Sequence, residues 1–81
     1  PAKMKDKLVF GIFEFSLPTY PVAVDLKLES LSPAGERKVL FHMKHPGGPI
    51  AVPFYQEENT VLILSVFNRE IIRQTVEKPK N

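Results

Sequence analysis

At 81 residues, with 43% hydrophobic residues and no cysteine, the chain is long enough for one globular domain and too short for two. The missing cysteines exclude disulfides and thiolate zinc sites, and they permit the cytoplasmic location that we expect for this protein. The net charge of +2 resides at the two ends, because the segment from Leu8 to Glu77 holds six Lys/Arg and eight Asp/Glu. Since nucleic-acid-binding proteins usually carry positive charge on a folded face, this distribution argues against nucleic acid as a partner.

The two ends of the chain carry charge and no apolar periodicity. We therefore expect residues 1–7 and 78–81 to be flexible tails of a single β-domain that comprises residues 1–81. No apolar run approaches the roughly 18–20 residues that cross a bilayer, so we predict no membrane association.

The first strand is predicted near the N-terminus. Apolar and polar residues alternate from Phe13 to Leu17 (FEFSL), which is typical of a half-buried strand with Glu14 and Ser16 outward. The preceding residues from Leu8 to Phe13 are apolar on both faces. Gly11 within them indicates a bulge or a close backbone approach, and two prolines then end the strand.

The clearest alternation runs from Val22 to Glu29 (VAVDLKLE), where the valines and leucines share one face. It resumes from Arg37 to Lys44. The inward residues of this second segment are Val39, Phe41 and Met43. Residues 32–35 (SPAG) fit a type I turn, so the two segments are predicted to form an antiparallel hairpin.

Three further segments complete the pattern. After a loop at residues 46–49 (PGGP), the segment from Ile50 to Phe54 keeps a period of two, and Pro53 places it at a sheet edge. Residues 60–67 (TVLILSVF) are almost continuously apolar, which predicts a strand buried on both faces. Four β-branched residues in six favour a strand at residues 71–76, although Asn68 would also suit the cap of a short C-terminal helix.

These five or six short strands predict an all-β fold, either a small antiparallel sandwich or a partly open barrel. The expected core consists of Val24, Leu26, Phe41, Ile63 and Phe67. The two doubly apolar segments need a second covering layer. A further sheet, the C-terminal helix or another subunit would supply it.

No motif indicates catalysis, a cofactor or a metal ion. His42 and His45 form an HxxH pattern, but on a strand these positions point to opposite faces. The PGGP loop lacks the pattern of a phosphate-binding loop, and neither Ser32 nor Ser65 has the setting of a nucleophile. We therefore predict that the protein is not an enzyme and needs neither cofactor nor metal.

We expect a non-catalytic β-domain that works through protein–protein contact or self-assembly, as a homo-oligomer or with an obligate partner. The predicted interface residues are Leu62, Ile63, Leu64, Tyr20 and Tyr55, which belong to the doubly apolar strand or lie near loops. One alternative is a small nucleic-acid-binding barrel, which eight aromatic residues and the basic ends would serve. A small-ligand-binding or catalytic domain is the third hypothesis.

Overall fold

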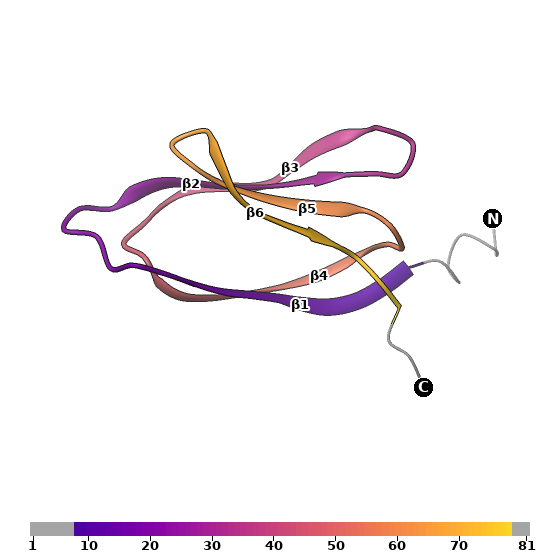
Figure 1. Cartoon of the computed structure of the whole chain (residues 1–81), viewed down its shortest axis with the longest axis horizontal. Helices are drawn as coiled ribbons and strands as arrows, with labels where there is room; N and C mark the ends of the chain where they lie inside the picture. Colours follow the sequence, from indigo (N-terminus) through magenta and orange to yellow (C-terminus); the bar gives the residue numbers. More distant parts are fainter. Residues whose placement is uncertain (1–7, 79–81) are drawn as a thin grey trace.

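The computed structural model describes residues 8–78, which form six antiparallel strands and no helix (Figure 1). The strands are β1 (Leu8–Leu17), β2 (Val24–Leu31), β3 (Arg37–His45), β4 (Gly48–Glu57), β5 (Val61–Val66) and β6 (Arg69–Thr75). The predicted all-β fold is confirmed, and the last segment is a strand. The predicted tails, apart from Lys78, lie outside the described residues.

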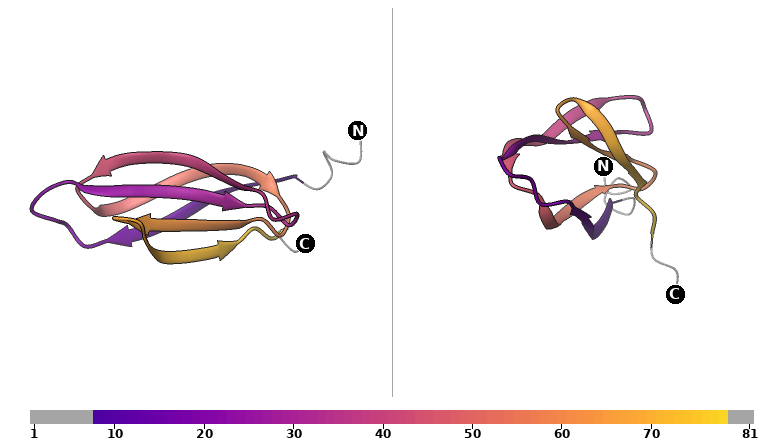
Figure 2. Two further views of the ribbon diagram at one scale, coloured as in Figure 1. Left: turned by 90° about the horizontal axis from the view of Figure 1, so that it is seen from above. Right: turned by 60° about the vertical axis from the view of Figure 1, so that its left-hand side comes forward.

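The strands form two sheets. β1 pairs with β4 alone, and the other four strands follow the order β3-β2-β5-β6. Seen from above, the four strands of the larger sheet lie side by side, with β1 and β4 in a second layer behind them (Figure 2). The shortest dimension of the chain, 16 Å, fits two packed sheets about 10 Å apart. Each sheet covers the inner face of the other, and within residues 8–78 no further layer covers the outer faces of the two doubly apolar segments.

The core lies between the two sheets. Its buried side chains are Val9, Phe13, Leu17, Leu26, Leu28, Leu62, Leu64 and Val76. Of the predicted core residues, Val24, Leu26 and Ile63 are buried, as expected. Phe41 packs against the core but is only partly buried, because β3 is an edge strand of the larger sheet.

Phe67 corrects the predicted core, since 61% of this residue is exposed. The predicted strand ran through Phe67, but β5 ends at Val66. Phe67 and Asn68 have φ angles of 52° and 64°. Two consecutive residues in this region form the type I′ turn that suits the twist of a two-residue hairpin. The geometry of the hairpin turn therefore leaves this phenylalanine exposed although its side chain is apolar.

A bulge in β3 changes the predicted parity of Val39. Phe41 pairs with Leu28 and Val39 pairs with Glu29, which leaves Leu40 as an extra residue. Val39 is consequently 56% exposed on the outer side of the sheet. Two other residues that were predicted to face inward, Met43 and Val22, are also exposed. Met43 lies on the edge strand, and Val22 precedes β2.

Three local predictions are confirmed. The amide of Gly35 donates to the carbonyl of Ser32 at 2.9 Å, as a type I turn at residues 32–35 requires. Pro53 lies in β4, which has one unpaired edge among the described residues. Gly11 is a site of close approach, because a Cβ there would lie 2.6 Å from the ring of Phe54 on the neighbouring strand.

Candidate interaction surface

The sheet of β1 and β4 has one face against the core and one that points away from it. We call the second face the β1–β4 outer face. Along β1, burial alternates: Val9, Phe13 and Leu17 are buried, whereas Phe10 and Ile12 are exposed. Along β4, Tyr55 follows the same exposed parity. Strand geometry therefore places these three side chains together on the outer face.

Phe10, Ile12 and Tyr55 form an exposed apolar group. Phe10 is 68% exposed, Ile12 54% and Tyr55 60%. Phe10 and Tyr55 are register partners, and their ring centroids are 6.4 Å apart in a tilted arrangement. Ile12 lies opposite Pro53, which is also exposed. Single exposed apolar residues are common on protein surfaces, whereas a contiguous group of them is a candidate contact site.

Charge on the β1–β4 outer face is sparse and negative. On the outward parity of the two strands, Glu14 and Glu57 are the only charged residues, and there is no lysine or arginine. The outward side chains of β1 and β4 therefore offer no cation to an anionic group, and most of them are apolar.

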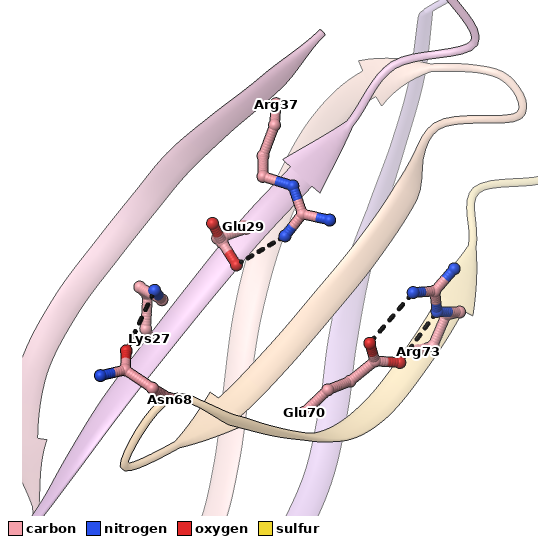
Figure 3. Close-up of polar contacts among 6 residues, drawn as sticks. All are labelled: Lys27, Glu29, Arg37, Asn68, Glu70 and Arg73. Carbon is pink, nitrogen blue, oxygen red and sulfur yellow. Dashed lines mark hydrogen bonds and ion pairs between the residues drawn. The ribbon is translucent and has the colours of Figure 1, made fainter. Parts of the chain in front are cut away.

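The outer face of the larger sheet has a different character (Figure 3). Its polar contacts include Arg37 Nη1 to Glu29 Oε1 at 3.1 Å, Lys27 Nζ to Asn68 Oδ1 at 3.2 Å, and Arg73 to both carboxylate oxygens of Glu70 at 2.8 and 3.0 Å. Long charged side chains cover apolar surface with their aliphatic parts while their charged groups remain in water. This face is therefore solvated.

Ile63 explains how β5 is buried on both faces, as its sequence predicts. The register places Ile63 on this outer face between Glu29 of β2 and Arg73 of β6. Although it points away from the core, Ile63 is only 1% exposed. Neighbours on both sides cover it, so a central strand of this protein needs no partner subunit to bury an outward apolar residue.

The structure places the five predicted interface residues in different environments, some buried and some exposed. Leu62 and Leu64 are fully buried between the sheets, and Ile63 is buried beneath its neighbours, so these three offer no surface to a partner. Tyr20 is partly buried against the core. Tyr55 is well exposed and belongs to the β1–β4 outer face. The residues that the sequence reasoning missed are Phe10 and Ile12.

The pair of Glu70 and Arg73 gives a pH prediction. The hydrogen bond from Arg73 lowers the pKa of Glu70 below its ordinary value. A carboxylate with a lowered pKa stabilises the fold above its unfolded pKa, and this contribution is lost as the pH falls through the folded pKa. Because both groups are exposed, we expect the effect on stability to be small. In an NMR titration, Arg73→Gln should raise the pKa of Glu70 toward its ordinary value, and an unmoved pKa would contradict the assignment.

The two histidines do not converge on one site. His42 Nε2 lies 2.7 Å from Asp25 Oδ1 on the outer side of the larger sheet. His45 Nδ1 accepts a hydrogen bond from the backbone amide of Gly47 at 3.0 Å. The PGGP loop has two backbone amide donors, those of its glycines, and this contact occupies one of them. Within residues 8–78, no three His, Cys, Asp or Glu side chains are grouped as metal ligands.

The depressions on the described part of the molecule include two that could be considered as sites. The first, of about 190 Å³, is mainly polar and has Ser30, Lys38 and Thr60 among its lining residues. The second is more open, about 450 Å³, and lies between Tyr20 and the β5–β6 hairpin, with Phe67 and Ile71 in its wall. Neither has the converging reactive groups of an active site. Residues 8–78 also include no helix that is long and apolar enough to cross a membrane.

Comparison with known proteins adds one relative. The chain is 28% identical over 74 residues, or 91% of its length, to an uncharacterized protein of Borreliella burgdorferi. It spans 23% of the length of that protein. No family model and no solved structure matches the chain.

Proposed function

We propose that this chain is a non-catalytic β-domain that works in the cytoplasm through protein–protein contact, by self-association at the β1–β4 outer face. The observation that carries the proposal is the exposure of Phe10, Ile12 and Tyr55 side by side on one face. Aromatic residues are enriched at contact surfaces because they bury a large area at a low cost in conformational entropy.

The alternative of a nucleic-acid-binding barrel has less support from the same surface. Phe10 and Tyr55 are exposed aromatics of the kind that stack on bases. However, single-stranded nucleic acid also requires cations that follow the phosphate backbone, and the outward parity of β1 and β4 has none. An apolar protein partner fits both the aromatics and the sparse charge.

The relative from Borreliella burgdorferi is compatible with this function. A match that takes up 23% of a longer protein is expected for a module that is joined to other segments. Contact between such modules, in one chain or between chains, would use an apolar surface of this kind.

Light scattering across a range of protein concentrations tests the proposal. We expect the unmodified chain to form a dimer or a larger symmetric oligomer, and Ile12→Lys to shift the mass toward the monomer because it places a charge within the apolar contact. Val22→Lys is the matched control, since Val22 is 71% exposed and lies outside both β1 and β4.

A monomeric mass for the unmodified chain at every concentration would contradict self-association. An equal effect of Ile12→Lys and Val22→Lys would show that the β1–β4 outer face is not the contact. Nucleic-acid binding that weakens steeply as salt rises would favour the alternative instead.

A further inference from the structure

Four strands have an edge that pairs with no other strand within residues 8–78: β1 and β4 of the smaller sheet, and β3 and β6 of the larger one. Proteins usually protect such edges against other chains with prolines, charged side chains (lysine above all) or bulges. The protecting residues are Pro49 and Pro53 in β4, Leu40 at the bulge with Lys38 and Lys44 in β3, and Ile71 at the bulge with Arg69 and Arg73 in β6. Three of the four edges are thus protected.

β1 is the exception. Its ten residues include no proline, lysine or arginine, their one charged side chain is Glu14, and the register with β4 runs from Leu8 to Leu17 without a shift. The outward side chains also include apolar ones, with Phe10 and Ile12 more than half exposed. A long, regular and apolar edge is a template for another strand.

The burial of Ile63 shows what β1 lacks. Ile63 points outward from a central strand, and neighbours on both sides reduce its exposure to 1%. Ile12 points outward from an edge strand, so Pro53 flanks it on one side only, and it remains 54% exposed. A strand added beside β1 would supply the missing neighbour.

We infer that two copies of this chain pair their β1 strands antiparallel about a twofold axis, which joins the two smaller sheets into one four-stranded sheet, β4-β1-β1′-β4′. The inference rests on the proposed function, and it places the contact at the β1 edge of the β1–β4 outer face. A twofold axis makes the partner strand a second β1, so each copy supplies the same unprotected edge that it requires.

The register follows from parity and charge. Outward residues must lie opposite outward residues, and placing Ile12 opposite Ile12 of the second copy pairs all residues from Leu8 to Ser16. Phe10 then lies opposite Glu14 of the second copy, whose side chain flanks the ring as Glu29 flanks Ile63. The two Glu14 carboxylates are four residues apart along the strands, about 13 Å, which exceeds the screening length in physiological salt.

Because the chain has no cysteine, single-cysteine variants test this geometry directly. In Ile12→Cys, antiparallel pairing places the two introduced Cα atoms about 4.5–5.5 Å apart, within the range of a disulfide. We expect oxidised glutathione to convert this variant to a covalent dimer. Ala51→Cys is the matched control: Ala51 is exposed on the β1–β4 outer face, but on β4. The two control positions are three strand spacings apart across the sheet and four residues apart along it, about 19 Å in all, so we expect at most about one-tenth of the Ile12→Cys yield.

The outcomes separate this inference from the proposed function. A dimer by light scattering together with efficient Ile12→Cys cross-linking and a weak control supports the paired β1 strands. A dimer in which Ala51→Cys cross-links as well as or better than Ile12→Cys overturns the edge pairing, because the sheets then stack face to face, and it leaves the proposed function standing. A monomeric mass overturns both.

The register is checked by mixing the Phe10→Cys and Glu14→Cys variants. A disulfide between the two variants supports the register, and the absence of this disulfide overturns it.

Discussion

Replacing Phe13 with alanine is expected to remove about 3–5 kcal/mol from the free energy of unfolding. Phe13 is fully buried between the two sheets, and its ring centroid lies 5.1 Å from that of Phe15. The substitution removes buried apolar surface and leaves a cavity that regular strands cannot close. Small domains have roughly 5–15 kcal/mol of stability in total, so the variant should be largely destabilised. Urea unfolding followed by circular dichroism measures the loss.

The matched control for this prediction is Phe10→Ala. Phe10 lies in the same strand but points to the opposite face, where it is 68% exposed. In dilute protein, where association is absent, we expect this variant to lose about 1 kcal/mol or less, chiefly from its contact with Tyr55. Equal losses in the two variants would contradict the assignment of faces in β1.

The second large effect is expected for Gly47→Ala, which should cost about 2–5 kcal/mol through steric overlap and an unfavourable backbone conformation. Gly47 has a φ of +95°, and a Cβ at this position would collide with the backbone carbonyl oxygen of Pro18 and approach the Tyr20 ring to 3.0 Å. The adjacent amide of Tyr20 donates to the carbonyl of Pro46 at 2.9 Å. Two loops that connect the sheets therefore meet here with no space between them.

Gly48→Ala separates the two causes. Gly48 has a φ of +87°, close to that of Gly47, but a Cβ there meets nothing within 4 Å. Its cost should be limited to the conformational penalty of about 1–2 kcal/mol. Thermal unfolding of both variants measures the difference. If Gly48→Ala destabilised the domain as much as Gly47→Ala does, backbone conformation alone would account for the loss, and the close approach to Pro18 would be unimportant.

The strands were predictable because each one has a local pattern. Alternation marks β2 and β3, and Pro53 marks β4 as an edge. The details that were wrong depend on pairing between distant residues. The bulge at Leu40 reflects the register of β3 on β2, and the exposure of Phe67 reflects the closing of a two-residue hairpin. Neither requirement leaves a periodic signal in its own segment.

Part of the candidate surface could be predicted from the sequence. Glu14 and Ser16 point outward, and the same parity continued backward along the strand gives Phe10 and Ile12. What the sequence does not contain is the division of six strands into sheets of two and four. That division makes β5 a central strand, which buries Ile63, and leaves β1 at an edge.

The pairing of β1 with β4 also determines the order in which the chain acquires its structure. The β2–β3 and β5–β6 hairpins join strands that are adjacent in the chain, whereas β1 must find β4 across the whole of the first hairpin. Closing that longer loop costs more chain entropy, so local hairpins form sooner. β1 is also synthesised before β4, and in that interval its apolar side chains have no intramolecular strand to pair with. We therefore expect protein concentration during folding to influence whether β1 first meets its own β4 or a strand of another molecule.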